Sequence, residues 1–387
     1  MKLKIGIINS EFFRGDLGGY GGYGSLTKYI SEKYNSQQES PFEFIVFLAH
    51  PHTKDKLIAY NTPVYPLKKT IPPIKFVEYR RRLNRIDVDL LLSIELSHGY
   101  LYTLLQKTDK PLIIWLQDPR SREEWEKIAT SKYIFNKEAK GRNINLIVAS
   151  YRITYKIVKR FCSNLTFATQ ARFLKYRAVR KYGTEDALKA RFLPNPINIP
   201  KKVRFADKAS QPTILFLGRL DPIKRPWIFF EIAKQMPEYL FLVAGKPHDF
   251  EYMRSRIEPY KKVKNLKFLG VVTGKQKDEI LRKSWILVNT SLHEALPVSF
   301  LEAFAYKIPV ISSQNPDNLT STFGYFVGEV LGDGYDSIEK FTRAIRILIE
   351  DEKERKRIGQ KAHKYVKKYH NFKMFERTLI KIYDSLL

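Results

Sequence analysis

The chain has 387 residues, and its 68 Lys and Arg residues against 40 Asp and Glu residues give a formal net charge of +28 at pH 7. A hydrophobic fraction of 44% excludes a disordered acidic tail and a collagen-like chain, and this length accommodates two domains of ordinary size. The one cysteine, Cys162, excludes an internal disulfide framework and a cysteine-based zinc site, and no apolar run approaches the roughly 20 residues of a membrane-spanning helix. We expect a very basic cytoplasmic protein, either soluble or peripheral on the inner face of the membrane.

Short apolar runs alternate with longer amphipathic segments in the first half of the chain, which is typical of β-α-β units. The predicted strands are 3–9, 42–48, 90–94, 112–116, 146–149 and 165–168. The predicted helices include 26–34, 100–106 and 153–161. Because several of these strands are almost wholly apolar, we expect a parallel sheet that is covered on both faces.

A proline-rich segment separates the two halves. Three prolines fall within 194–200 and a polar stretch follows as far as residue 212, so this segment is the predicted linker. Beyond it the predicted strands are 213–217, 239–244, 266–269, 285–289 and 310–312, and the predicted helices are 227–235, 275–283, 298–306, 337–350 and 353–369. The expected fold class is α/β, with two doubly wound Rossmann-like domains facing a cleft.

A glycine-rich segment, 18–25, follows the first predicted strand and leads into the helix at 26–34. Glycines such as Gly21 and Gly22 let backbone N–H groups approach an anion, and the start of a helix adds partial positive charge. A phosphate or sugar site is one interpretation, and a flexible loop is the other. Neither the lysine of a Walker A loop nor the glycine spacing of a dinucleotide fingerprint is present.

A second motif, Gly218-Arg219 with Lys224 five residues further on, follows the strand at 213–217. Ligands of α/β sheets bind at the carboxyl ends of the strands. An arginine that contacts phosphate in bidentate fashion and a lysine that acts as a point charge together suit a diphosphate. The alternative is an ordinary basic surface loop.

A third motif, 293–305, follows the strand at 285–289 and contains Glu294 and Glu302. Leu296-Pro297 marks a helix start, which places Glu302 about one turn inside the helix and Glu294 in the loop before it. The two carboxylates can then reach one site from different depths. The alternative is that they only complement the dipole at the helix start.

In this order and context, the second and third motifs resemble those of the retaining GT-B glycosyltransferases of family 4, the glycosyl transferases group 1. The E-x7-E motif of that family corresponds to Glu294 and Glu302, and its G-R-x-x-x-x-K loop corresponds to Gly218, Arg219 and Lys224. The resemblance covers most of the chain and is strongest between residues 214 and 313.

The resemblance extends to Gly21-Gly22, which matches the glycine pair before the first helix of such enzymes. It implies an N-terminal acceptor-side domain at 1–195, completed by a crossover helix at about 371–387. It further implies a linker at 196–212 and a nucleotide-sugar-binding domain at 213–370.

The resemblance also implies a donor site for a nucleotide diphosphate sugar, with a UDP-sugar favoured over a GDP-sugar. Arg219 and Lys224 would hold the diphosphate, Glu302 the ribose hydroxyls and Glu294 the hydroxyls of the donor sugar. Backbone N–H groups at the helix start would hold the distal phosphate, and the residues of this start are Leu296, Pro297, Val298 and Ser299. Fixed cations and a helix dipole stabilise a leaving diphosphate, so neither a metal nor another cofactor is expected.

Two positions depart from the family pattern. A His-Asp pair that family members often carry near the donor sugar is replaced by Gln117-Asp118. A glutamine amide donates and accepts hydrogen bonds but does not titrate near neutrality, so Gln117 and Asp118 are candidates for sugar or acceptor contact only. His98 is a candidate substitute, against the alternative of an ordinary loop histidine. Lys307 stands where the family usually has glycine, which puts a tight turn in question.

The excess positive charge is densest at 80–85 and 142–191, and the latter range has 12 basic residues against Glu185 and Asp186. An anionic membrane surface, nucleic acid or no partner at all would each account for it. We favour the membrane over nucleic acid as the partner of this charge, because no nucleic-acid-binding signature is present. The expected acceptor is a glycan or a lipid-linked molecule. Asp87-Val88-Asp89 spells a metal-binding D-x-D motif but precedes a strand, so no metal site is assigned.

Two other classes of function remain open. The same scaffold serves nucleotide-sugar epimerases and phosphorylases, although no motif for a pyridoxal-phosphate lysine is present. A non-enzymatic basic protein that binds nucleic acid or membrane is the third possibility, and the specificity of the two C-terminal motifs makes it the weakest.

Overall fold

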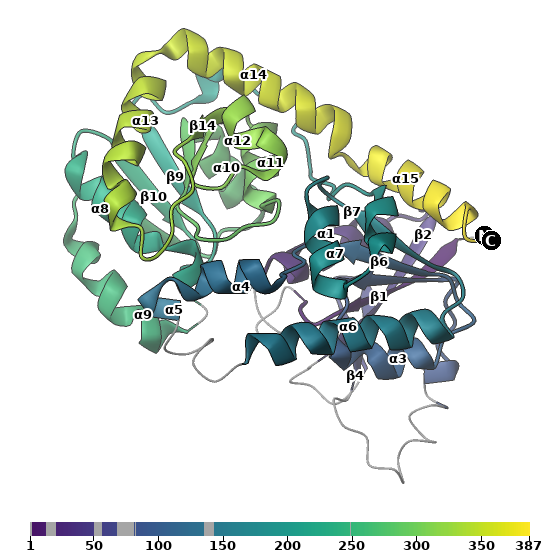
Figure 1. Cartoon of the computed structure of the whole chain (residues 1–387). Coiled ribbons are helices and arrows are strands. Elements are labelled where there is room, and N and C mark those ends of the chain that lie inside the picture. The colour runs from purple at the N-terminus through teal and green to yellow at the C-terminus, as the bar shows by residue number, and fades with distance from the viewer. Residues whose placement is uncertain are drawn as a thin grey trace. The chain divides into compact units, whose positions relative to one another are not determined.

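The structure is a computed structural model, and it describes residues 2–12, 21–49, 56–67, 81, 83–134, 143–247 and 249–387. The chain divides into two compact units, each with its own sheet, of which the second is wholly parallel and the first almost so (Figure 1). The first unit comprises Met1–Arg122, Asn143–Asn195 and Phe375–Leu387, and the second comprises Glu123–Arg142 and Pro196–Met374. The predicted glycine-rich and arginine-rich residues at 18–20, 80, 82 and 142 lie outside the described residues.

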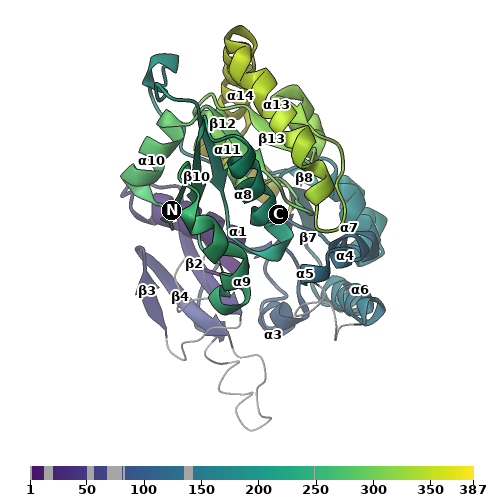
Figure 2. The ribbon, with the colours of Figure 1, turned by 90° about the vertical axis from the view of Figure 1, so that its left-hand side faces the viewer.

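The first unit contains an eight-stranded sheet in the order β3-β4-β2-β1-β5-β6-β7-β8. Its strands are β1 (Leu3–Asn9), β2 (Phe42–Ala49), β3 (Leu57–Ala59), β4 (Thr62–Leu67), β5 (Leu90–Ile94), β6 (Leu112–Leu116), β7 (Leu165–Thr169) and β8 (Arg191–Phe192). All pairings are parallel except that of β3 with β4, which lie at one edge (Figure 2).

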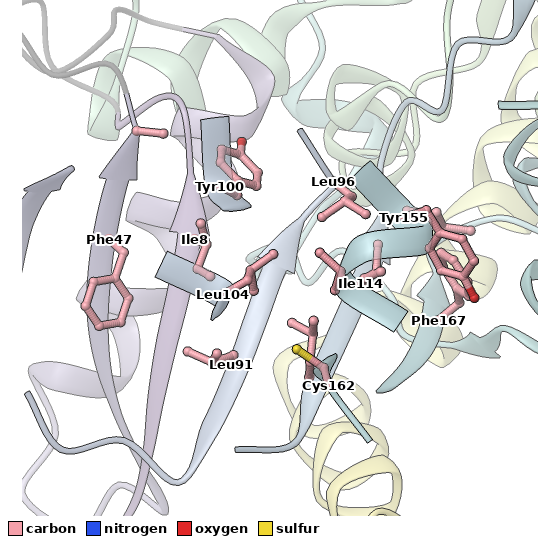
Figure 3. Close-up of a cluster of buried hydrophobic side chains, with 14 of the residues drawn as sticks. Ile8, Phe47, Leu91, Leu96, Tyr100, Leu104, Ile114, Tyr155, Cys162 and Phe167 are labelled. Atoms are coloured by element: carbon pink, nitrogen blue, oxygen red, sulfur yellow. The ribbon is translucent and has the colours of Figure 1, made fainter. Parts of the chain in front are cut away.

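Helices cover both faces of this sheet, because side chains of a strand alternate between the two faces. The helices are α1 (Gly22–Asn35), α3 (Leu101–Leu105), α6 (Ile144–Phe161), α7 (Leu174–Tyr182) and α15 (Phe372–Asp384). On one face Phe47 of β2 joins the core under α3, α6 and α7, and Figure 3 labels part of that cluster: Ile8, Phe47, Leu91, Leu96, Tyr100, Leu104, Ile114, Tyr155, Cys162 and Phe167. On the other face Phe44 meets Tyr34 of α1, and Phe375 of α15 lies against both Tyr34 and Trp115.

The predicted strand at 146–149 is wrong, because these residues belong to α6. The Asn143 side chain caps that helix by accepting from the backbone N–H of Asn145 and Leu146. Val148 and Tyr155 are buried at a spacing of seven residues, which is two helical turns. The short apolar run is thus part of a longer helical pattern.

The second unit contains a six-stranded parallel sheet in the order β11-β10-β9-β12-β13-β14. Its strands are β9 (Thr213–Leu217), β10 (Leu240–Ala244), β11 (Leu266–Gly270), β12 (Ile286–Asn289), β13 (Val310–Ser312) and β14 (Gly324–Phe326). Its helices are α4 (Arg122–Ala129), α5 (Lys132–Ile134), α8 (Pro226–Gln235), α9 (Phe250–Ile257), α10 (Gly274–Lys283), α11 (Val298–Ala305), α12 (Leu319–Thr322), α13 (Ile338–Glu350) and α14 (Glu352–Tyr369).

Short 3-10 helices complete the described chain: η2 (His98–Tyr100), η4 (Glu185–Lys189), η5 (Phe205–Asp207), η6 (Pro222–Lys224), η7 (Glu258–Lys262), η8 (Pro316–Asn318) and η9 (Tyr335–Ser337). None of the described helices combines the length and apolar composition that a membrane crossing needs.

The assignment of α4 and α5 differs from the sequence prediction, which placed residues 123–142 in the first domain. Ile128 and Ile134 of these helices are buried in a cluster with Leu292, and Ile223 packs against it. Lys127 of α4 also pairs with Glu329 at 2.5 Å. Because the apolar face of α4 and α5 is buried there, this segment belongs to the second unit although it precedes the linker.

Candidate functional site

The loops after β9 and β12 emerge side by side, because these parallel strands are neighbours, with Ile214 beside Ile286 and Leu215 beside Leu287. The first loop leads into η6, which ends at Lys224. The second leads through Glu294 into α11. Such a carboxyl edge is where ligands of α/β sheets bind.

Lys224 and Glu294 are in direct contact, with 2.5 Å between Nζ and Oε1. Glu294 is buried, and the same oxygen also accepts from Asn289 Nδ2 at 3.0 Å and Ser291 Oγ at 2.7 Å. Burial by itself raises the pKa of Glu294, but the charge and hydrogen bond of Lys224 and the two further donors outweigh it. The pKa therefore lies below its ordinary value, and the carboxylate is ionised at neutral pH.

Arg219 makes a different contact, because its Nε lies 3.1 Å from Asp221 Oδ2. Its side chain is more than a third exposed. Gly218 bonds the end of β10 through its N–H, and Gly245 follows that strand in a left-handed conformation. A Cβ at Gly245 would lie 1.8 Å from the carbonyl oxygen of Gly218. Gly245, which the motifs did not point to, therefore lets the two loops approach, and its place directly after an apolar strand is the signal that could have found it.

Helix α11 begins beside this pair. Leu296 and Pro297 are buried, whereas Val298 and Ser299 are partly exposed. Among the described residues, no side chain caps α11, and its first turn has no acidic residue. The N–H groups of its first turn and its partial positive charge therefore remain suited to an anion.

Glu302 lies inside α11 and accepts a hydrogen bond from Lys277 of α10 at 2.5 Å. Sequence reasoning missed Lys277, which lies 25 residues earlier in the chain on a different helix and carries no motif. The two motif carboxylates are thus each paired with a lysine, but with different ones.

Arg225, directly after Lys224, was also missed, and it is 1% exposed with a left-handed backbone of φ 45°. Its guanidinium donates to Thr290 O (2.8 Å), Val330 O (3.0 Å), Gly332 O (3.2 Å), Ser291 O (3.2 Å), Ser313 Oγ (3.3 Å) and Leu331 O (3.4 Å). Burial lowers the pKa of Arg225 to about 10, which leaves it charged at neutral pH. The side chain thus ties together the loops after β12 and β13 and the 330–332 loop.

Helices α4 and α5 support the same loops from outside. Thr130 Oγ1 accepts from the N–H of Gly332 at 2.9 Å, and Ser131 Oγ donates to Asp333 at 2.9 Å. Ile128 packs in a cluster with Leu292, and Ile223 packs against this cluster. Ile223 lies in the loop of Lys224, and Leu292 lies in the loop of Glu294. The N–H of Leu292 donates to the carbonyl of Ile223 at 2.8 Å, so the Lys224 and Glu294 loops are joined by their backbones.

In the first unit, Gly21 lies at the start of α1, and the carboxylate of Glu11 occupies the space beside it. A Cβ at Gly21 would lie 1.7 Å from Glu11 Oε2, and this oxygen accepts from the N–H of Gly24 at 3.4 Å. Gly22 has open space around its Cα. The anion at this helix start is therefore an internal carboxylate in this structure, and donor binding by Gly21 and Gly22 stays a prediction.

Gln117 lies inside the first unit and is 3% exposed. Its amide exchanges two hydrogen bonds with that of Asn195, at 3.0 and 2.9 Å, and Gln170 bonds both the Asn195 amide and the Gln117 carbonyl. These contacts use the amide to hold together the loops after β6 and β7 and Asn195, the last residue of the middle segment of the first unit. In this structure the side chain is therefore committed to the fold rather than presented to a sugar.

Asp118 and His98 have surroundings that differ from those of the Gln117 amide. The Asp118 carboxylate pairs with Arg120 at 2.8 Å, and His98 is exposed at the first position of η2. These contacts differ from those of the Gln117 amide, which bonds Asn195. A sugar contact by either of them stays a prediction.

Glu95 fixes the Gln117-Asp118 loop and is another residue that sequence reasoning missed. Its Oε1 accepts from the N–H of Gln117 at 2.6 Å and from that of Asp118 at 2.9 Å. Its Oε2 accepts from Lys181 and from Tyr182, both at 2.8 Å, and the Glu95–Lys181 pair is buried. Like Arg225, Glu95 has a left-handed backbone, with φ 60°.

No group of three or more potential metal-ligating side chains is present in the part of the chain that the structure describes. Asp87 and Asp89 of the D-x-D motif both contact Lys4, whose Nζ lies 3.2 Å from Asp87 and whose N–H lies 2.8 Å from Asp89. Their contacts hold the start of β1 beside the segment that precedes β5.

Residues 199–365, all within the second unit, match the family described as glycosyl transferases group 1. Over almost the whole chain, the structure is similar to Anabaena HepE in complex with UDP and glucose, with a TM-score of 0.71, 13% identity, and 99% and 100% of the two chains covered. It is equally similar to the sucrose-phosphate synthase of Thermosynechococcus elongatus, with a TM-score of 0.71, 15% identity, and 100% and 99% covered. The chain has a GT-B fold. Two doubly wound parallel domains are therefore confirmed, and the cleft between them stays a prediction.

Relatives of known activity match parts of this GT-B chain. The poly(glycerol-phosphate) alpha-glucosyltransferase of Bacillus subtilis (strain 168) is 27% identical over 148 residues, which are 36% of this chain and 20% of that protein. The UDP-Gal:alpha-D-GlcNAc-diphosphoundecaprenol alpha-1,3-galactosyltransferase of Escherichia coli is 28% identical over 188 residues, which are 43% of this chain and 46% of that protein. The chain thus spans less than half the length of these curated relatives.

Proposed function

We propose that this protein is a glycosyltransferase that moves a hexose from a nucleotide diphosphate sugar to an acceptor, with retention of anomeric configuration and without a metal. The observation that carries this proposal is the contact between Lys224 and the ionised, buried Glu294 at the carboxyl edge of the second sheet. The group 1 match over residues 199–365 supports it.

The geometry suits the charges that form as a glycosyl–phosphate bond breaks. Negative charge builds on the leaving diphosphate. Lys224 and the uncapped start of α11 stabilise it, because their positive charge is already in place before the bond breaks. Positive charge builds on the anomeric carbon, and the carboxylate of Glu294 stabilises it. We assign Arg219 to the diphosphate and Glu302 to the ribose, with Lys277 holding the Glu302 carboxylate in place.

A UDP-sugar is the proposed donor, and a glycan or lipid-linked molecule is the proposed acceptor. Structures of HepE contain UDP with glucose and UDP-glucose, and the name of the E. coli relative specifies a UDP-galactose donor and a diphosphoundecaprenol-linked acceptor. These properties belong to those proteins and support the proposal for this one by similarity.

Nucleotide release from a panel of UDP- and GDP-sugars tests the proposal, together with calorimetry of UDP and GDP binding. We expect UDP to bind more tightly than GDP, and we expect Lys224→Met and Glu294→Gln to lower the rate of UDP release about 10²-fold or more. Lys340→Met and Glu339→Gln are matched controls on the exposed side of α13 and should retain full activity. Silence with every donor, or full activity in Glu294→Gln, would refute the proposal.

A further inference from the structure

Helix α6 has apolar side chains on both its faces. Val148 and Tyr155 face the core, whereas Leu146 and Ile153 on the outer side are 69% and 58% exposed. Leu146 and Ile153 are seven residues apart, which is two helical turns, so they share one outer face. A surface helix of a globular protein normally keeps its outer face polar. The last residue of α6, Phe161, is also 58% exposed.

Basic side chains share this outer face. Lys156 and Arg160 follow Ile153 by three and seven residues and are exposed, and neither α6 nor α7 contains an acidic residue. The neighbouring η4 contributes Glu185 and Asp186, of which Asp186 is engaged by Lys159 and by Tyr155 at the edge of the helix. Figure 1 labels helix α6. We call its outer face, with Leu146, Ile153, Lys156, Arg160 and Phe161, the α6 surface.

We propose that the α6 surface docks on an anionic lipid bilayer. Exposed aliphatic and aromatic side chains alternating with lysine and arginine are the composition of helices that lie in the headgroup region of such membranes, because the apolar groups insert while the long basic side chains reach the lipid phosphates. The proposal does not depend on the donor site, since α6 belongs to the first unit.

Other occupants fit this composition less well. The cores of protein interfaces are depleted of lysine, whereas here cations lie between the apolar side chains. Nucleic acid backbones would engage Lys156 and Arg160 but offer nothing apolar to Leu146 and Ile153. An anionic bilayer offers both an apolar interior for the aliphatic and aromatic side chains and phosphates for the basic ones.

Sedimentation of the full chain with vesicles, in the absence of nucleotide, tests the proposal. We compare vesicles of phosphatidylcholine alone with vesicles that also contain phosphatidylglycerol, at low and at raised ionic strength. Binding should require phosphatidylglycerol and weaken with salt. Ile153→Ser should reduce the partition constant by at least about tenfold, whereas Ile58→Ser, at a 71% exposed isoleucine of β3, should not change it.

The role of charge is tested by matched double variants. Lys156→Glu/Arg160→Glu should abolish binding, while Lys364→Glu/Lys368→Glu on exposed positions of α14 changes the net charge equally and should leave most binding intact. Circular dichroism and thermal unfolding, which should match those of the parent, establish that each variant folds. The proposal is overturned by absence of vesicle binding, by equal losses in the two double variants, by a dimer that Ile153→Ser dissolves, or by duplex DNA binding that this variant removes. None of these results bears on the transferase proposal.

Discussion

The charge state of Glu294 depends strongly on Lys224. Burial is the largest influence on this carboxyl and raises its pKa, and the pKa is nevertheless low because Lys224, together with the bonds from Ser291 and Asn289, outweighs that effect. A carboxyl with a lowered pKa in the folded state stabilises the protein above its ordinary value of 4.5, and this contribution is lost as the pH falls below that value.

Lys224→Met should therefore raise the pKa of Glu294 above its ordinary value, because burial then prevails over the bonds from Asn289 and Ser291. Donor-binding heat and residual nucleotide release should both show an acid limb at higher pH than in the parent. Urea denaturation should show that Glu294 no longer contributes to the loss of stability on acidification; with a raised pKa its contribution is instead lost as the pH rises through that pKa. Lys340→Met is the control, and an unchanged acid limb in Lys224→Met would contradict the assignment.

At the residue scale, the motifs in the sequence identified the candidate site residues but not the residues whose contacts fix the loops around them. Arg225 and Glu95 both have left-handed backbones, for which glycine is the usual signal, and the partners of each come from distant parts of the chain. Lys307 illustrates the same difficulty, because it forms its tight turn with φ 59° without a glycine. Its Nζ bonds the carbonyl of Val203 at 2.8 Å, which anchors the turn. Such positions depend on tertiary contacts rather than on local preference.

At the element scale, α4 and α5 support the second unit through Ile128, which is buried against Leu292. Ile128→Ala should destabilise that unit by about 2–4 kcal/mol, because it removes a buried aliphatic side chain and leaves a cavity. Hydrogen exchange should rise in the segments 286–296 and 326–334 and should stay unchanged in β1. Ile153→Ala, at an exposed isoleucine, is the control. Faster exchange in β1 alone would place α4 in the first unit instead.

Through a glycine, helix α14 packs closely on the turn at Lys307 that follows α11. A Cβ at Gly359 would lie 2.3 Å from the carbonyl oxygen of Lys307, which is backbone and must shift to make room. Gly359→Ala should therefore destabilise the second unit by about 1–3 kcal/mol, although alanine is the better helix former. Gly22→Ala in α1 has open space and serves as the matched helical control. Thermal unfolding measures both, and a stabilised Gly359→Ala would show that α14 does not contact the Lys307 turn at this position.

Elements with strong patterns were predictable, and edge elements were not. The predicted bounds of β1, β5, β6, β9 and β13 agree with the structure, because these strands are nearly continuous apolar runs covered on both faces. The short strands β3, β4, β8 and β14 lie at or near sheet edges and were missed. β3 has only three residues, and the other three carry proline, charge or glycine. The assignment of residues 123–142 to the second unit was missed, because it depends on packing and no sequence pattern marks it.

At the scale of the whole molecule, the chain returns to its first unit after completing the second. Phe375 of α15 is fully buried, with ring centroids 5.6 Å from Trp115 and 6.2 Å from Tyr34. Arg191 of β8 also bonds Ser385 and the carbonyl of Lys381. The segment Phe375–Leu387 therefore completes the core of a unit whose other residues all precede the linker.

Removal of residues 372–387 should consequently unfold the first unit selectively. The cut exposes Trp115 and Tyr34 and removes Phe375, a loss of at least about 3–5 kcal/mol by comparison with the truncation of one buried phenylalanine. Calorimetry should show one transition lowered strongly and the other, from the second unit, little changed, and UDP binding heat should persist if the donor site folds independently. Removal of residues 386–387, of which Leu387 is 82% exposed, is the control and should change neither transition. A single transition that falls as a whole would show instead that the two units unfold as one cooperative body.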